Sequence, residues 1–224
     1  FGVLAKFKFL RGTAFDIFGY TAERKMERRL AADDQTTGDM AILAGRDALK
    51  NAGLTGDDID GVIVATTTPD RIFPAVAVKV QAELGIPPGA AFDVQAVCTG
   101  FVYALGVANS FIVTGQAKRI LVIGAEKMSA VVDWSDRTTC VLFADGAGAV
   151  ILEAGEGAGT VQDRGIISTH LYANGKHRDL LYTDGGPSTK GGSGKIVMHG
   201  REVFKHAVQY MADVVAEALE KNNI

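Results

Sequence analysis

The chain has 224 residues, of which 47% are hydrophobic and 22% are charged, so it carries enough apolar material for one large domain or two half-domains. Its 23 basic and 26 acidic side chains leave a formal charge of -3, which excludes the basic field that draws proteins to nucleic acid or anionic lipid. Two cysteines are too few for a disulfide framework, so we expect a reduced, cytoplasmic protein.

The apolar stretches near the start of the chain and at residues 94–117 predict neither a secretory signal nor a membrane span. Lys6, Lys8 and Arg11 interrupt the apolar residues of the first stretch. The second stretch has no charged residue, but polar side chains such as Asn109 favour a buried helix over a span in lipid.

From Thr36 onward the pattern alternates between helix and strand. A helix is predicted from about Thr37 to Gly53, because apolar residues recur there at helical spacing. Further helices are predicted at about 74–84 and 99–114. Between the helices are short, β-branched apolar runs, typical of strands covered on both faces: Gly61–Ala65, Arg119–Gly124 and Ala149–Leu152. The alternation predicts an α/β fold with a parallel or mixed sheet between helices.

The residue pattern changes near residue 160, beyond the run Gly155-Glu156-Gly157. This change predicts a first half, residues 1–160, and the beginning of a second half, residues 161–224. A strand is predicted at Gly165–Tyr172, followed by a polar surface excursion that extends to Gly194. Residues 201–221 then predict an amphipathic helix with one apolar face.

Cys98 lies where an extended segment, residues 91–97, meets the uncharged helix. At a helix N-terminus the dipole and the unpaired N–H groups favour a nucleophilic thiolate, and the same N–H groups suit an oxyanion. This arrangement suits acyl transfer, whereas the alternative is an inert buried cysteine. Cys140, in an apolar run at 139–143, is predicted to be a reduced core residue.

Residues 94–101 read Val-Gln-Ala-Val-Cys-Thr-Gly-Phe, and this run resembles the nucleophile motif of the β-ketoacyl-acyl-carrier-protein synthase III family. Further blocks that resemble the family occur in the family's order, and the resemblance extends from about Glu27 to Ile224. These blocks are residues 65–70 (Ala-Thr-Thr-Thr-Pro-Asp), 73–75 (Phe-Pro-Ala), 133–137 (Asp-Trp-Ser-Asp-Arg), 145–149 (Asp-Gly-Ala-Gly-Ala), 165–171 (Gly-Ile-Ile-Ser-Thr-His-Leu) and 200–205 (Gly-Arg-Glu-Val-Phe-Lys).

The resemblance implies a thiolase-like, layered α-β-α-β-α fold, of which the chain holds the first half and the beginning of the second. It also implies a dimeric, cytoplasmic condensing enzyme that primes fatty acid synthesis. The cysteine takes an acyl group, acetyl above all, from acyl-CoA. A carbanion from malonyl-acyl carrier protein then attacks the thioester to give a 3-oxoacyl-acyl carrier protein. No cofactor is implied, because acyl-CoA is a substrate.

The resemblance assigns a role to five residues of this chain. Cys98 is the nucleophile. Phe73 lines the acyl pocket of the dimer partner, with a plain core aromatic as the alternative. Arg137 contacts the CoA nucleotide, and Phe204 and Lys205 line the entrance for pantetheine and carrier protein; the alternatives are a solvated arginine and an ordinary surface charge.

Two departures from the family bear on function. Residues 1–22 are atypical, and the aromatic residue that stacks on the CoA adenine is missing. The family's catalytic His and Asn come from its last third, and none of the four histidines present lies in the matching motif, so the chain alone is expected to be inactive in the full condensation. Two alternatives therefore stay open: a related condensing enzyme with another acyl-CoA or acceptor, and a non-catalytic fragment.

Metal and phosphate-loop sites are not predicted. Residues 145–148 read Asp-Gly-Ala-Gly without a following Lys-Ser or Lys-Thr, so they indicate a tight passage into a strand instead. No Cys/His pair has zinc spacing.

Overall fold

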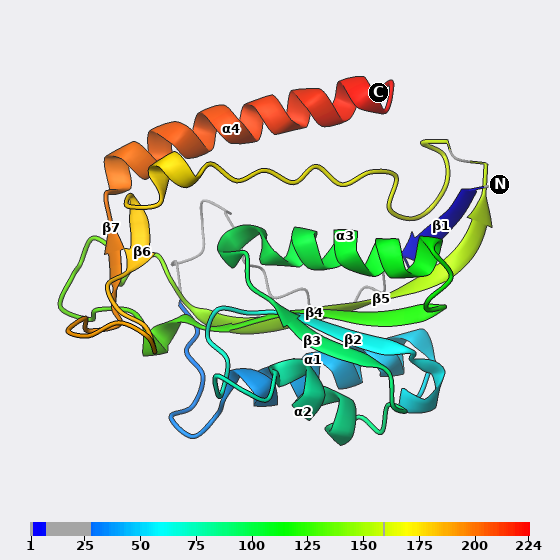
Figure 1. Cartoon of the computed structure of the whole chain (residues 1–224), viewed down its shortest axis with the longest axis horizontal. Helices are drawn as coiled ribbons and strands as arrows, with labels where there is room; N and C mark the ends of the chain where they lie inside the picture. The colour runs from blue at the N-terminus through cyan, green and yellow to red at the C-terminus, as the bar shows by residue number, and fades with distance from the viewer. Residues whose placement is uncertain (1, 8–27, 159) are drawn as a thin grey trace. The chain divides into compact units, whose positions relative to one another are not determined.

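The computed structural model describes residues 2–7, 28–158 and 160–224, the first of these ranges by its backbone (Figure 1). Most of the atypical start of the chain therefore lies outside the described residues. The chain forms two compact units: unit 1 comprises Phe1–Lys127 and Asp145–Thr169, and unit 2 comprises Met128–Ala144 and His170–Ile224. The predicted division at residue 160 stays a prediction.

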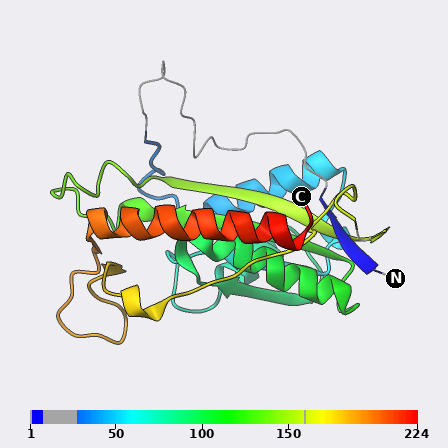
Figure 2. The same ribbon diagram turned by 90° about the horizontal axis from the view of Figure 1, so that it is seen from above.

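Unit 1 is built on a five-stranded mixed sheet with the order β1-β5-β4-β2-β3. Its strands are β1 (Gly2–Phe7), β2 (Gly61–Ala65), β3 (Ala90–Val94), β4 (Arg119–Lys127) and β5 (Asp145–Gly157). β2 runs parallel to β3 and β4, whereas β5 is antiparallel to both β4 and β1. Figure 2 shows β1 at the edge of this sheet, beside β5. The predicted mixed sheet is confirmed.

Helices cover both faces of the sheet, with α1 (Thr37–Ala52) and α2 (Val76–Glu83) on one face and α3 (Gly100–Val113) on the other (Figure 1). Alternate residues of β2 point to opposite faces, so Val62 and Val64 pack towards α1 and α2, whereas Ile63 packs towards α3. Every residue of β2 is buried. The apolar, β-branched character of this strand follows from burial on both sides.

Local signals in the sequence explain where α1 begins and ends. Thr36 accepts a hydrogen bond from the Asp39 amide, and the Asp39 carboxylate accepts one from the Thr36 amide, which together form a capping box. Gly53 ends the helix in the left-handed conformation with φ 67°, which glycine adopts without steric penalty. A short 3₁₀ turn, η1 (Gly56–Asp58), then leads into β2.

Unit 2 contains a two-stranded antiparallel sheet and a long helix. The sheet pairs β6 (Leu181–Thr183) with β7 (Ile196–Met198), and the remaining elements are the 3₁₀ turns η3 (Met128–Ala130) and η4 (Gly175–His177) and the helix α4 (Gly200–Lys221). Figure 2 shows α4 as one unbroken helix, as the spacing of its apolar residues predicts. Its apolar stripe is largely exposed, with Phe204 at 72% and Met211 at 70%.

Three predictions about segments are wrong. Gly165–Tyr172 forms no strand, because no neighbouring strand pairs with it in the described residues. Asp145–Gly148 is not a passage into a strand but the first part of β5, where it pairs with the end of β4. Cys140 is a free cysteine but only partly buried, and the next two residues, Val141 and Leu142, are 47% and 51% exposed, so Cys140 is not a core residue. Among the described residues, no helix is long and apolar enough to cross a membrane.

Candidate functional site

Cys98 lies between β3 and α3, in a short 3₁₀ turn, η2 (Val97–Thr99), that runs directly into the helix. Its side chain is exposed and makes no disulfide. The predicted position of the cysteine, where an extended segment meets a helix, is confirmed. Because the side chain is exposed, the alternative of a buried cysteine is wrong. An exposed thiol at a strand-to-helix junction is accessible to a thioester substrate.

The backbone around Cys98 is held in a tight turn. The amide and the hydroxyl of Thr99 both donate to the carbonyl oxygen of Ala96, at 3.2 and 2.9 Å. Val97 adopts φ 48°, in the left-handed region that is unfavourable for a β-branched residue. Because the Val97 side chain is 58% exposed, its own burial does little to offset this strain. The strain lies immediately before the candidate nucleophile.

The residues after Cys98 seat the turn on the sheet. Gly100 is buried, and a Cβ there would lie 3.3 Å from the Cβ of Ala65, at the end of β2. The Phe101 ring lies over Gly124 of β4, where an added Cβ would lie 3.4 Å from the ring. The missing side chains of Gly100 and Gly124 thus let the helix approach two central strands closely.

Asp93 and Phe92 connect the strand before Cys98 to two different helices. The carboxylate of Asp93 accepts hydrogen bonds from the amides of Val76 and Ala77, at 2.8 and 2.9 Å, and so caps the start of α2. The rings of Phe92 and Phe111 are tilted with centroids 6.1 Å apart, so β3 also packs on α3. The sequence did not reveal this cap, because Asp93 lies on β3, 17 residues after the Val76 amide that it binds.

Phe73 lies in unit 1, in the loop between β2 and α2. Its side chain is 81% exposed, and the neighbouring Ile72 is 74% exposed. The alternative of a plain core aromatic is therefore wrong. A large exposed aromatic side chain needs an apolar partner surface to be buried.

Arg137 lies in unit 2 on a segment shaped by two aspartate turns. Ser135 donates from its hydroxyl and its amide to Asp133, and these bonds hold the pKa of the Asp133 carboxyl below its ordinary value. Thr138 does the same for the pKa of Asp136. Arg137 lies within the second turn, and its side chain is exposed.

Phe204 and Lys205 are consecutive residues of α4 in unit 2, and both are exposed. The ring of the next residue, His206, packs against His177 of η4, with ring centroids 4.1 Å apart. Of the five predicted site residues, Cys98 and Phe73 thus belong to unit 1, and the other three belong to unit 2. Their assigned roles stay predictions.

Another polar cluster that the sequence did not reveal lies at the end of β2. The Glu126 carboxylate accepts hydrogen bonds from the amide and hydroxyl of Thr67 and from the hydroxyl of Thr68, at 2.6 to 3.0 Å. The run of three threonines was the available signal. Across the described ranges, no group of three or more His, Cys, Asp or Glu side chains is arranged to hold a metal ion.

Fold and site together define a class: layered α/β proteins that carry an accessible cysteine between a central strand and the next helix. A family model described as 3-oxoacyl-[acyl-carrier-protein] synthase III matches residues 92–175, which include Cys98 and Arg137. A second model, of a family of unknown function, matches residues 1–42.

Curated relatives named β-ketoacyl-[acyl-carrier-protein] synthase III extend the match over nearly the whole chain. The protein from Jannaschia sp. is 54% identical over 221 residues, which cover 98% of this chain and 68% of the relative. The protein from Rhodospirillum centenum is 60% identical over 88% of this chain, but the match spans only 61% of the relative's length. The chain belongs to the β-ketoacyl-[acyl-carrier-protein] synthase III family.

Solved structures agree with this assignment. The 3-oxoacyl-[acyl-carrier-protein] synthase III of Aquifex aeolicus has a TM-score of 0.79 at 46% identity, over 88% of this chain and 60% of that one. The synthase III of Thermus thermophilus has a TM-score of 0.79 at 35% identity, over 100% of this chain and 73% of that one. The predicted thiolase-like fold is confirmed.

Proposed function

We propose that the protein primes fatty acid biosynthesis as a condensing acyltransferase, with Cys98 as the nucleophile. The observation that carries the proposal is the exposed thiol of Cys98 in η2, directly before α3. The chain is 54% identical, over 98% of its own length, to a relative named for this activity. The family model that matches residues 92–175 is itself named for 3-oxoacyl-[acyl-carrier-protein] synthase III.

The proposed chemistry has two half-reactions. In the first, the Cys98 thiolate attacks the thioester carbonyl of acyl-CoA, and the CoA thiolate leaves as the acyl-cysteine forms. In the second, malonyl-acyl carrier protein loses carbon dioxide, and the resulting carbanion attacks the acyl-cysteine. The product is a 3-oxoacyl-acyl carrier protein, and the Cys98 thiolate is regenerated. Neither half-reaction changes a redox state, so we propose that the protein needs no cofactor.

We propose supporting roles for the other site residues. The exposed Phe73 would be buried by lining the acyl pocket of a second copy in a homodimer. The planar guanidinium of Arg137 suits the phosphates and adenine of CoA. Phe204 offers an apolar side chain to pantetheine, and Lys205 offers a cation to the acidic carrier protein. The reduced cysteines and the absence of a net positive charge support a cytoplasmic protein without nucleic-acid or membrane partners.

Acyl transfer to Cys98 is testable by intact-protein mass spectrometry. After incubation with acetyl-CoA, we expect a mass gain of one acetyl group, located on Cys98 by peptide mapping. Cys98→Ala should abolish the gain, whereas Cys140→Ala, which removes the other free thiol, should retain it. Acylation of Cys140 instead of Cys98, or no acylation with any acyl-CoA, would contradict the proposal. Adding malonyl-acyl carrier protein to the acylated protein then tests the condensation; because none of the four histidines lies in the family's motif, these 224 residues alone are expected to form no 3-oxoacyl product.

A further inference from the structure

The loop between β2 and α2 carries an apolar tip on a polar base. Ile72 and Phe73 at the tip are 74% and 81% exposed, so they contribute little to the folding of the chain that carries them. Residues 71–74 are all exposed. The contacts that fix the direction of the tip must therefore be made by residues in the base of the loop.

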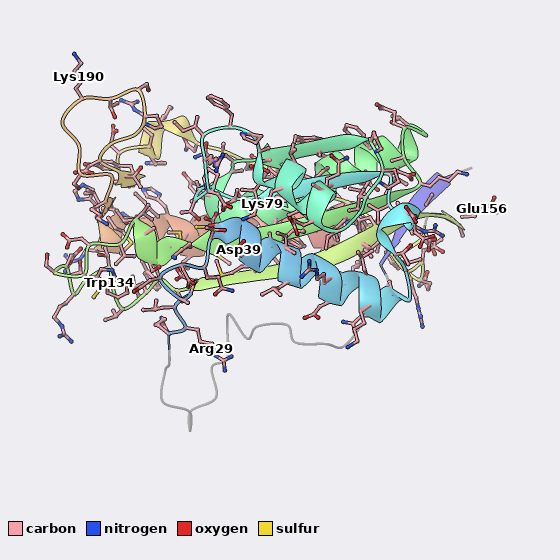
Figure 3. The ribbon with its side chains drawn as sticks, turned by 90° about the horizontal axis from the view of Figure 1, so that it is seen from below. Arg29, Asp39, Lys79, Trp134, Glu156 and Lys190 are labelled. Carbon is pink, nitrogen blue, oxygen red and sulfur yellow. The ribbon has the colours of Figure 1, made fainter. Side chains whose placement is uncertain are left out.

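Asp70 is the residue that connects this base to α1. Its Oδ1 accepts a hydrogen bond from the Gly38 amide at 2.7 Å, and its Oδ2 accepts one from the Thr36 hydroxyl at 2.9 Å. Lys79 of α2 donates to the same Oδ2 at 2.9 Å and also to Oδ1 of Asp39 at 2.7 Å. We call these five residues the Lys79 cluster. Figure 3 shows Lys79 and Asp39 pointing towards each other from their two helices.

The first turn of α1 leaves room for this cluster. A Cβ on Gly38 would lie 2.6 Å from Oδ2 of Asp70 and 2.9 Å from Cδ of Lys79, so a larger residue would push both side chains away. The side chain of Asp70 is only 16% exposed and that of Lys79 is 37% exposed. Their ion pair is therefore screened less than a pair on the open surface.

Both ends of the loop are also fixed. At its start, Thr67 and Thr68 bind the Glu126 carboxylate, and at its end Asp93 holds the first amides of α2. Asp70 adds a third anchor immediately before the exposed tip. An apolar tip held in this way loses little conformational entropy when a partner surface covers it.

We propose that Asp70 and Lys79 are positioning residues for Phe73, and that by holding the loop they set the acyl-chain selectivity of the reaction at Cys98. The proposal rests on the proposed function, in which Phe73 lines an acyl pocket of the dimer. A fixed Phe73 presents one surface to the acyl chain, so short and long chains are distinguished sharply. A released loop lets the ring move aside and reduces that discrimination.

The test compares the rates at which acetyl-CoA and octanoyl-CoA acylate Cys98 in the protein and its variants. We expect Lys79→Met to lower the acetyl-to-octanoyl ratio of kcat/KM about threefold or more, with the rate for saturating acetyl-CoA little changed. Lys79→Arg keeps the charge and should retain most of the ratio. The matched control is Glu83→Gln, which breaks another ion pair between α1 and α2, Arg46–Glu83 at 4.0 Å, without touching the loop.

A second readout does not depend on catalysis. Hydrogen–deuterium exchange of peptides that contain residues 70–75 should be faster in Lys79→Met than in the unsubstituted protein, and unchanged in Glu83→Gln. Unchanged exchange in Lys79→Met, or an acetyl-to-octanoyl ratio equal to that of Glu83→Gln, would overturn the proposal. If no acyl-CoA acylates the unsubstituted protein, the proposed function itself fails and the selectivity role falls with it, whatever the exchange data say about the loop.

Discussion

The turn at Cys98 combines an exposed thiol with a backbone that neighbouring residues constrain. Val97 occupies the left-handed region with φ 48°, and Thr99 closes the turn on Ala96 with two hydrogen bonds. Such conformations persist only where the surroundings over-determine them. Here the buried Gly100 and the packing of Phe101 on β4 supply that constraint.

Acidification tests the Lys79 cluster through the carboxyl of Asp39. The hydrogen bond from Lys79, followed by that from the Thr36 amide, lowers the pKa of Asp39 from 3.8 to about 2. A carboxyl with a lowered folded-state pKa stabilises the protein above its ordinary pKa, and this contribution is lost as the pH falls towards about 2. We expect the free energy of unfolding to fall less steeply between pH 4 and pH 2 in Asp39→Asn than in the unsubstituted protein, as measured by urea denaturation. Parallel curves would contradict this assignment.

Residues differ in how much of their role the sequence reveals. Cys98 was predictable, because a cysteine between an extended run and an apolar helix has a distinctive local pattern. Phe73 was assigned by resemblance alone, and only the structure shows that its side chain is exposed. Asp70 and Lys79 could not be paired in advance, because the contact depends on how the loop between β2 and α2 folds against α2.

Among the elements, α2 depends on a cap that lies outside it. Its N-cap residue, Ala75, makes no side-chain hydrogen bond, and the Asp93 carboxylate of β3 binds the first two amides instead. Replacing a side-chain cap by alanine typically costs about 0.5–2 kcal/mol. We therefore expect Asp93→Ala to lower the free energy of unfolding by about 1–2 kcal/mol, as measured by urea denaturation. Asp58→Ala removes a carboxylate that caps only the three-residue turn η1, and should cost less.

The elements that sequence analysis placed well have strong local signals. β2 and β4 are apolar at successive positions because helices cover both faces, and α1 begins with a capping box. Two errors came from pairing, which is not local. Asp145–Gly148 contains two glycines yet forms strand, because it continues the antiparallel ladder with β4. Gly165–Tyr172 is apolar enough for a strand, but none of the described strands pairs with it.

For the molecule as a whole, stability should depend on the two layers that sandwich the sheet of unit 1. Leu121 of β4 is 0% exposed and packs with α1 and α2 in the larger of these layers. We expect Leu121→Ala to reduce the free energy of unfolding by about 2–5 kcal/mol. Met211→Ala on α4, where the side chain is 70% exposed, should change it by about 0.5 kcal/mol or less. Equal effects of the two substitutions in urea denaturation would contradict this account of the core.

The order of strands in unit 1 has a consequence for synthesis on the ribosome. β1 ends at Phe7, and its partner β5 begins only at Asp145, after the chain has left unit 1 at Lys127 and returned. β1 therefore emerges long before the strand that it pairs with has been translated, and the nascent β4 has one edge open from its completion at Lys127 until β5 follows. Unpaired strand edges invite pairing with other chains. Protection of the growing polypeptide by a chaperone would matter most in that interval.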